Sequence, residues 1–277
     1  MTLSEKTVAL IGLGQIGGSL GLDLLGGRLA RGVVGFDSAS GVAEAARELG
    51  AIDEAASTLE AAVADADLIV LALPIRALPR ELKRLRSAAP GHALFLDLAG
   101  TRVEIMRTVS ELKLEARYVG AHPLAGSEGV GLDSARMALF REAVFALTAH
   151  SDLTPANRTT AENLVHALGG RVVHLTPDQH DAAIALTSHL PHALAISLMR
   201  IFAEERADQP LLPELIGGSF RDATRVAASS PELMLDMFIS NREELLRVLD
   251  RFAGELDDLR KLLAQNEEQG LRDFIDP

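Results

Sequence analysis

The 277 residues contain no cysteine and no tryptophan, and only one tyrosine. Without cysteine there is no disulfide scaffold and no thiolate site for zinc or an iron–sulfur cluster, so we expect a cytoplasmic protein. No uninterrupted apolar run approaches the roughly 20 residues that cross a bilayer. Glycines cut short the first apolar segment, residues 8–11, which is therefore not typical of a signal peptide. We expect no membrane partner.

Positive charge is also scarce. There are 27 Lys and Arg against 39 Asp and Glu, a formal net charge of −12. This balance argues against nucleic acid as a partner, because binding to a phosphate backbone requires basic surface. The composition is otherwise that of a globular protein, with 48% hydrophobic and 24% charged residues, and the length suggests two domains.

The first half of the sequence alternates short aliphatic runs with helical stretches. Strands are expected at residues 8–11, 33–36, 68–73, 93–98 and 118–121. Helices are expected at 16–25, 41–49 and 77–88. Two further strands, 144–148 and 171–175, flank a helix near 156–168 and should complete the same sheet. Strand–helix alternation with continuous aliphatic strands predicts a mostly parallel sheet covered by crossover helices.

From residue 176 onward no strand pattern is found, and three helical patterns cover 178–206, 211–228 and 231–269. The last has one apolar stripe, formed by Leu235, Phe238, Leu245, Val248, Leu249, Phe252, Leu256, Leu259 and Leu263. We predict an α/β domain over residues 1–175 and an all-α domain over 176–277. So thin a helical domain should also pack against a second copy in a two-fold homodimer. The alternative is that the first domain covers its stripes.

A glycine-rich turn links the first expected strand to the first expected helix. Gly12, Gly14 and Gly17 have the spacing that lets the chain approach a pyrophosphate, and the following helix N-terminus supplies free amides. Gln15 and Ile16 lie inside the same turn and are counted with it as cofactor-binding residues.

Two more segments extend this expected cofactor site. Asp37 closes the second strand 20 residues after Gly17, where a carboxylate can bind the ribose hydroxyls. No arginine follows it within residues 38–40 to bind a 2′-phosphate, so NAD is favoured over NADP. Leu73 and Pro74 end the third strand at the carboxyl edge of the sheet, where the cofactor crevice should lie.

Two polar regions carry the remaining chemistry. His122 opens the segment His-Pro-Leu-Ala-Gly-Ser-Glu directly after an expected strand, so it should reach the edge where the nicotinamide is expected. In the helical half, Ser-His-Leu-Pro-His spans residues 188–192 and Arg-Asp-Ala-Thr-Arg spans 221–225.

Together with Gly-Leu-Gly-Gln-Ile-Gly-Gly-Ser at residues 12–19, these blocks resemble the prephenate/arogenate dehydrogenase family of tyrosine biosynthesis. The resemblance covers nearly the whole chain. It implies a Rossmann domain followed by a helical dimerisation domain, with NAD-dependent oxidative decarboxylation of a cyclohexadienyl substrate. Prephenate, giving 4-hydroxyphenylpyruvate, is the expected substrate, and arogenate, giving tyrosine, is the alternative.

The resemblance also implies roles for individual residues. His122 would hold and deprotonate the ring C4 hydroxyl while hydride leaves C4. Arg225 would pair with a substrate carboxylate, a task that suits a guanidinium fork. Ser188 and His192 would line the substrate pocket, and Glu128 would help gate it. No metal is expected, because the nicotinamide is the electron acceptor.

One segment departs from the family pattern. The family carries Asp-x-Gly-Ser-x-Lys with the serine hydroxyl beside the catalytic histidine, and here residues 97–102 read Asp-Leu-Ala-Gly-Thr-Arg. Aligned on Asp97, Gly100 replaces the serine. Counted back from His122, Thr101 takes its place, and Thr101 is preferred because it preserves the hydroxyl.

Two other functions fit part of this sequence pattern. A β-hydroxyacid dehydrogenase also joins a Rossmann domain to helices, but it typically uses a lysine on the helical domain, and no lysine lies between Lys113 and Lys261. A non-catalytic NAD-binding dimer is the other alternative, with the lost serine as a first sign of decay. The presence of His122, Arg225 and the 188–192 block argues against it.

Overall fold

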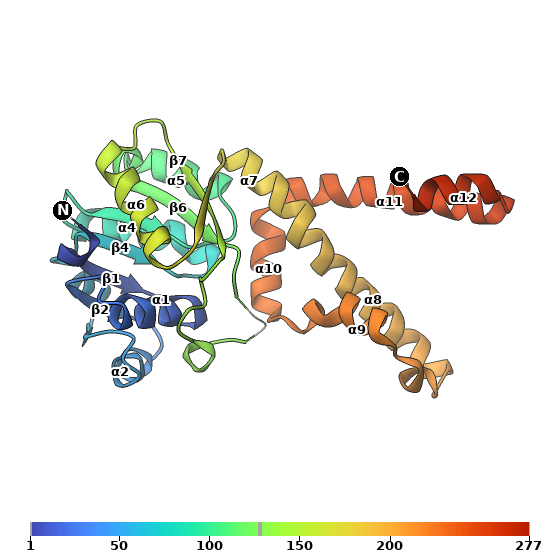
Figure 1. The fold of residues 1–277 in the computed structure, drawn as a ribbon, viewed down its shortest axis with the longest axis horizontal. Coiled ribbons are helices and arrows are strands. Elements are labelled where there is room, and N and C mark those ends of the chain that lie inside the picture. Colours follow the sequence, from blue (N-terminus) through green and yellow to red (C-terminus); the bar gives the residue numbers. More distant parts are fainter. Residues whose placement is uncertain (1, 127–128, 277) are drawn as a thin grey trace. The chain divides into compact units, whose positions relative to one another are not determined.

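A computed structural model describes residues 2–126 and 129–276. Its first part contains an eight-stranded sheet in the order β3-β2-β1-β4-β5-β6-β7-β8, in which neighbours are parallel except for the antiparallel pair β6 and β7 (Figure 1). The strands are β1 Thr7–Ile11, β2 Gly32–Phe36, β3 Glu54–Ala55, β4 Leu68–Leu71, β5 Leu94–Asp97, β6 Tyr118–Pro123, β7 Val144–Ala149 and β8 Arg171–His174. The predicted α/β fold with a mostly parallel sheet is confirmed.

Helices cover both faces of this sheet. On one face α1 Gln15–Gly26 and α6 Pro155–Ala167 pack into a common core, and on the other α4 Leu78–Ala88 and α5 Val103–Glu111 do so. The central strand β4 is fully buried as a result, which explains its run of four aliphatic residues. The shorter helices of this part are α2 Val42–Glu48 and α3 Leu59–Val63.

One strand was missed by the sequence analysis. β3 has only two residues, Glu54 and Ala55, and pairs with Val34 and Gly35 at the edge of the sheet. These two residues form a strand because they hydrogen-bond to β2, not because they belong to an apolar run. No local sequence pattern therefore predicts β3. All seven predicted strands are present.

The chain divides into two compact units, each described by itself. The first comprises Met1–Asp181 and Ala228–Ser240, and the second Ala182–Ala227 and Asn241–Pro277. The helices from residue 176 onward are α7 Pro177–Ile184, α8 Leu190–Asp208, α9 Gly218–Thr224, α10 Pro231–Ser240, α11 Arg242–Gln265 and α12 Glu268–Ile275. The first unit therefore includes α10, a segment that the prediction placed in the helical domain. The predicted boundary at residues 175/176 stays a prediction.

The continuous helix expected over 231–269 was wrong. The chain leaves the helical conformation at Asn241, with φ −120° and ψ 32°, and again after α11 at Asn266, with φ 52°. Asn241 is buried, and its amide Nδ2 donates to Nδ1 of His189 at 3.2 Å. The apolar stripe continues through this point, so the sequence pattern does not indicate the break. Such a stripe indicates which side chains are buried, but not the backbone conformation.

A π-helical turn, Ala185–His189, connects α7 to α8. Pro191 lies in the first turn of α8 and has no N–H to donate to a carbonyl four residues earlier, so a regular α-helix through this point would lose a bond and clash. The wider turn accommodates the proline. Such turns inside helices are frequent at functional sites, and this one contains Ser188.

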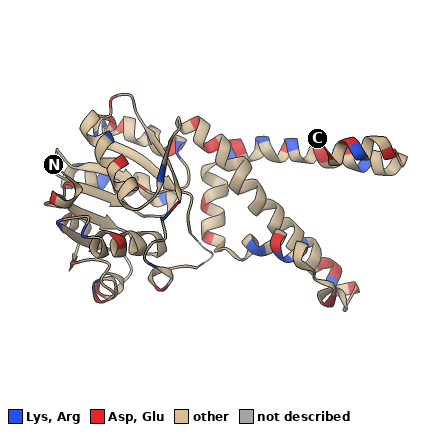
Figure 2. Cartoon of the chain, viewed as in Figure 1, with Lys and Arg blue, Asp and Glu red and all other residues tan. Residues whose placement is uncertain are grey.

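The second unit presents much apolar surface. No Asp, Glu, Lys or Arg occurs from Ala182 to Met199, and Figure 2 shows α8 uncharged over much of its length. Within the described residues, the helical run Pro177–Asp208 is long enough to cross a membrane and contains an 18-residue window of mean hydropathy 1.4, so it passes this test by length and composition alone. Packed helices of soluble proteins pass the same test.

Candidate active site

The glycine-rich turn adopts the conformation that the spacing predicts. Gly12 has φ 91°, and a Cβ there would collide with the carbonyl of Ala72, while a Cβ at Gly17 would collide with the carbonyl of Gly12. A Cβ at Gly14 would meet open space, which leaves room for a ligand group over the turn. Gly14 caps α1 without a side-chain hydrogen bond, so the N-terminal amides of this helix point toward that space.

Asp37 lies at the end of β2, beside the same turn. Its Oδ2 accepts from the backbone N–H of Leu13 at 2.8 Å, and its Oδ1 accepts from that of Ala39 at 2.9 Å. These bonds hold the carboxylate in place and leave lone pairs on both oxygens for the hydroxyls of a ribose.

Leu73 and Pro74 follow β4 at the carboxyl edge of the sheet. Leu73 approaches Gly12, since a Cβ on that glycine would lie 3.2 Å from Leu73 Cδ2. Pro74 precedes a short 3-10 helix, Ile75–Ala77, against which α10 packs. Arg76 of this turn pairs with Asp236 of α10 at 3.7 Å. The structure thus brings Gly12, Leu73 and α10 to one edge of the sheet.

His122 lies near the end of β6 and is only partly exposed. Its Nδ1 is 2.9 Å from Nε2 of His180, and Nδ1 of His180 is 2.7 Å from Oδ1 of Asp181. His180 and Asp181 are buried, with 0% and 2% of their surface exposed. A chain of three side chains therefore leads from His122 into the protein interior.

Gly100 lies on the other side of the His122 ring. A Cβ at Gly100 would be 3.8 Å from His122 Nε2. Thr101 is 1% exposed, and its hydroxyl has no hydrogen-bond partner within residues 2–126 and 129–276. A hydroxyl at position 100 would therefore face the histidine, whereas that of Thr101 does not bond to it here. This geometry favours Gly100 as the place of the family's serine, and the assignment of Thr101 stays a prediction.

A buried ionic cluster supports the loop that carries Gly100. The Arg102 guanidinium donates to Asp97 Oδ2 at 2.7 Å and to the carbonyl of Ala99, and the Tyr118 hydroxyl donates to the same Asp97 oxygen at 2.7 Å. Gly120 makes room for the guanidinium, because a Cβ there would collide with it. The backbone N–H of Ala99 donates to Asp97 Oδ1 at 2.9 Å. Asp97 and Arg102 thus bond to the N–H and the carbonyl of Ala99, and so fix the backbone next to Gly100.

Burial and charge determine the protonation states in this cluster. Burial raises the pKa of the Tyr118 hydroxyl well above its usual value, and the neighbouring Asp97 carboxylate raises it further. Burial lowers the pKa of Arg102, but the charge and hydrogen bond of Asp97 outweigh it, and the net shift is upward. Arg102 therefore stays a cation and Tyr118 stays neutral at physiological pH.

The helical site residues lie in the second unit. The His192 ring donates from Nδ1 to the carbonyl of Ser188 at 2.8 Å, one turn earlier, which leaves its Nε2 as an acceptor. Arg225 is exposed at the end of α9. α9 packs on α8 through the rings of Phe220 and Phe202, whose centroids are 4.9 Å apart.

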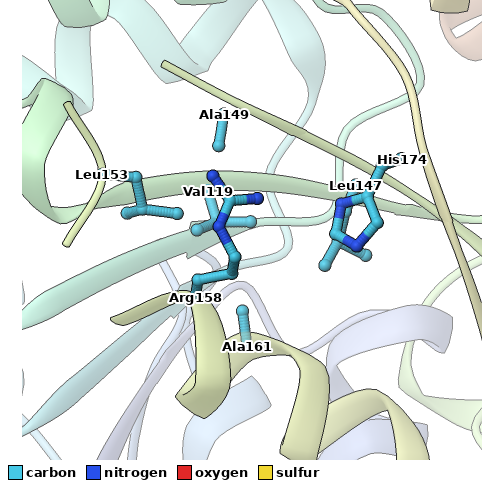
Figure 3. A pocket seen from close by; sticks show the side chains of 7 residues that line it. All are labelled: Val119, Leu147, Ala149, Leu153, Arg158, Ala161 and His174. Carbon is cyan, nitrogen blue, oxygen red and sulfur yellow. The ribbon is translucent and has the colours of Figure 1, made fainter. Parts of the chain in front are cut away.

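Two other features lie apart from these residues. Glu128 is outside the described part of the chain. A hollow of about 10 Å³ opens between β6, β7 and α6 (Figure 3). It is lined by Val119, Leu147, Ala149, Leu153, Arg158, Ala161 and His174. None of these is a predicted site residue, and the space would hold at most about one water molecule.

Comparison with protein families assigns both parts of the chain. Residues 24–186 match the model of the prephenate dehydrogenase nucleotide-binding domain, and residues 176–276 match that of the prephenate dehydrogenase dimerization domain. The chain belongs to the prephenate dehydrogenase family.

Relatives in this family share nearly the whole chain. Cyclohexadienyl dehydrogenase of Zymomonas mobilis is 33% identical over 95% of this chain and 90% of its own length. Prephenate dehydrogenase of Aquifex aeolicus, solved in complex with hydroxyphenyl propionate and NAD⁺, is 26% identical with a TM-score of 0.92, over 100% of this chain and 96% of its own. Synechocystis arogenate dehydrogenase is 29% identical with a TM-score of 0.84, over 98% and 96%.

Within this member of the family, the sequence analysis missed the partners of the predicted histidine. His180 and Asp181 form a dipeptide near the start of α7, a place where a polar pair is ordinarily read as a solvated helix end. The only available signal was Asp181 itself, an acidic residue one helical turn after the Thr176-Pro177 helix start. Nothing in the sequence indicated that α7 would bury this pair.

Proposed function

We propose that the protein is an NAD-dependent prephenate dehydrogenase, which oxidatively decarboxylates prephenate to 4-hydroxyphenylpyruvate in tyrosine biosynthesis, with arogenate as the alternative substrate. The observation that carries this proposal is the setting of His122. One ring nitrogen bonds to a buried partner, and the other lies beside a residue without a side chain. The families of the two matched domains and the cytoplasmic biosynthetic role expected from the sequence agree with it.

The residues of this chain supply the proton chemistry. A neutral imidazole at His122 accepts the proton of the substrate's C4 hydroxyl through Nε2, which favours departure of hydride from C4. NAD⁺, when bound, accepts that hydride. Loss of the ring carboxylate as CO₂ then leaves its bonding electrons in the ring, and the C4 oxygen takes a proton back from His122. The product is an aromatic phenol, which makes the reaction effectively irreversible. Thr101 stays the proposed source of the hydroxyl that the family's serine provides, although this hydroxyl does not bond to His122 in the structure.

The residues around the glycine-rich turn fit a dinucleotide. Gly12, Gly14 and Gly17, with Gln15 and Ile16 in the first turn of α1, would hold the pyrophosphate. Leu73 and Pro74 would flank the nicotinamide half. Asp37 would bind the ribose hydroxyls of the adenosine half and repel a 2′-phosphate.

Replacing Asp37 with serine should therefore weaken NAD⁺ binding by about 10- to 100-fold, the effect of losing hydrogen bonds to a charged group. Discrimination against NADP⁺ should fall at the same time. Isothermal titration with both dinucleotides measures the two effects. Asp37→Asn is the matched control for charge, since it retains an acceptor oxygen of similar size. A parent protein that binds NADP⁺ more tightly than NAD⁺ would refute this role.

On the helical side we propose that Arg225 binds a substrate carboxylate, that Ser188 and His192 line the pocket, and that Glu128 gates it. The C-terminal part of α9 and the π turn suit this task, because both present polar groups from rigid backbone. His192 is oriented by its bond to the Ser188 carbonyl, so its free nitrogen can accept from a substrate hydroxyl.

Arg225→Ala should mainly raise KM for the substrate, by about 10- to 100-fold, because a carboxylate pair is made in both the ground state and the transition state. Steady-state kinetics at saturating NAD⁺ separates KM from kcat. Arg221→Ala, one turn earlier on the same helix and also exposed, is the control and should leave both constants near the parent values. An unchanged KM in Arg225→Ala removes the residue from substrate binding.

We also propose a homodimer formed through the helical domain. Several large apolar side chains of the second unit are more than half exposed, among them Leu186, Ile201, Leu211, Leu256 and Leu263. Covering this surface is favourable by about 25 cal/mol per Å², and the matched dimerization-domain family supports a second copy as the partner. Sedimentation velocity at micromolar concentration should show one species near twice 29.5 kDa. A purely monomeric boundary contradicts the dimer.

The activity itself is tested by following NADH absorbance in a mixture of purified protein, NAD⁺ and prephenate, with a second series on arogenate. Absorbance should rise with prephenate faster than with arogenate at equal concentration. A faster rise with arogenate selects the alternative substrate. A flat trace with both, from protein that binds NAD⁺, favours a non-catalytic NAD-binding dimer.

A further inference from the structure

The bonds of the buried pair His180 and Asp181 reach beyond their own helix. Asp181 accepts from the backbone N–H of Arg102, at 2.8 Å to Oδ1 and 3.1 Å to Oδ2, and Oδ2 accepts from that of Val103 at 2.9 Å. These are the amides of the N-cap residue Arg102 and of Val103, the first residue of α5, and the Arg102 side chain makes no capping bond. The free amides and the dipole of a helix N-terminus attract negative charge, so the Asp181 carboxylate is favourably placed there.

An ionised Asp181 fixes the direction of every bond in the chain. A carboxylate can only accept, so Nδ1 of His180 must carry a hydrogen and donate to Asp181 Oδ1. In a neutral His180 ring, Nε2 is then bare and accepts. The hydrogen between the two rings therefore belongs to Nδ1 of His122, and the remaining nitrogen, His122 Nε2, carries the lone pair.

This tautomer is the one that the reaction needs. His122 Nε2 is the nitrogen beside Gly100, since a Cβ at Gly100 would lie 3.8 Å from it. The opposite tautomer would present an N–H to the substrate hydroxyl and could not remove its proton. An isolated imidazole populates both tautomers, so a fixed partner on Nδ1 is required to select one.

We propose that His180 and Asp181 are positioning residues that hold the catalytic histidine of this enzyme in the Nδ1–H tautomer, with Asp181 anchored on the N-terminus of α5. The role of His122 as a base rests on the function proposed above. The tautomer rests only on the contacts of five residues in the first unit, His122, His180, Asp181, Arg102 and Val103. Because the His180 ring stands between Asp181 and His122, the Asp181 carboxylate also stays away from the substrate, which is itself an anion.

The tautomer can be measured directly in the resting protein. Nitrogen-15 NMR of histidine-labelled full-length protein at neutral pH should show a His122 ring with a proton on Nδ1 and a bare, pyridine-type Nε2. His122→Asn assigns the resonances by their disappearance. A His122 ring protonated on Nε2 in the neutral state overturns the proposal.

Three variants test the consequence for turnover. His180→Phe keeps a ring of similar size but removes both nitrogens, and we expect kcat to fall about 10²- to 10⁴-fold with little change in KM, the range from a typical general base to the loss of a partner that sets an imidazole tautomer. His180→Gln retains an acceptor near the position of Nε2 and should recover much of that loss. Asp181→Asn allows the amide to donate to His180, which reverses the direction of the hydrogen bonds and should also lower kcat by about 10²- to 10⁴-fold.

These outcomes separate a positioning role from a structural one. A residue needed only for packing would lower stability in His180→Gln as well as in His180→Phe, without the recovery of kcat. A kcat in His180→Phe within about threefold of the parent would contradict the proposal. Should that variant fail to fold, the NMR result on the parent protein still decides the tautomer. Should the parent turn over neither cyclohexadienyl substrate, the NMR result stands independently, and only the proposed function fails.

Discussion

Replacing His122 with asparagine is expected to lower kcat by about 10²- to 10⁴-fold, the range for loss of a general base. Asparagine suits the test because its Nδ2 lies where Nδ1 of the ring lay and can still donate to His180. The nitrogen at the Nε2 position is then the group removed. Because His122 is not part of the glycine-rich turn, NAD⁺ affinity should stay within about twofold of the parent, an expectation that follows from the near-independence of separate sites.

Stopped-flow or steady-state NADH formation measures this change, and titration calorimetry measures the binding of NAD⁺. His166→Asn is the control for the substitution itself, since His166 is exposed on α6. Equal turnover in His122→Asn and the parent would remove His122 from the mechanism, and the proposed activity would lose the observation that carries it.

The position of His122 was predictable because two independent signals agree there. A β-rich run ends at it, so parallel-sheet geometry places it at the carboxyl edge, and the residues that follow match a family block. The glycine-rich turn and Asp37 were predictable for the same reason. In each case a local pattern coincides with the end of a strand, and a sheet of this type collects such ends at one edge.

The partners of His122 were not predictable in this way. The contact between His122 and His180 joins residues 58 positions apart, and the contact between Asp181 and Arg102 joins residues 79 apart. Both depend on how α7 turns back after β8, the last strand of the sheet. Periodicity shows which face of a helix is buried, but it does not show what that face meets.

The break at Asn241 is a second feature that helical periodicity does not predict. The apolar stripe of 231–269 continues across it, so the pattern predicts one helix. The structure instead uses the buried Asn241 amide to bond His189 in the second unit. The benefit of this hydrogen bond exists only in the folded chain, and sequence propensity records nothing of it.

The largest expected effect on stability belongs to Arg102. Its guanidinium and the Asp97 carboxylate are both fully buried, at 0% exposure. Arg102→Met keeps the length and removes the charge, which leaves Asp97 buried with its carboxylate bonded to Tyr118 and the Ala99 amide but without a cation. Breaking one side of a buried pair costs about 3–5 kcal/mol, because the desolvated charge that remains is uncompensated.

Urea denaturation, followed by circular dichroism at pH 7, should therefore show a large fall in the midpoint for Arg102→Met. Arg80→Met is the control, because Arg80 is 77% exposed and its partner Glu81, whose side chain is 9% exposed, keeps a second cation in Arg84 at 3.0 Å. Exposed pairs contribute at most about 1 kcal/mol, so its midpoint should barely change. Asp97→Asn in combination with Arg102→Met removes both charges and should recover part of the loss, since the penalty comes from an unpaired charge and not from the lost attraction alone. An Arg102→Met midpoint equal to that of Arg80→Met would mean that solvent reaches Asp97, and the loop that holds Gly100 beside His122 would then lack its rigid support.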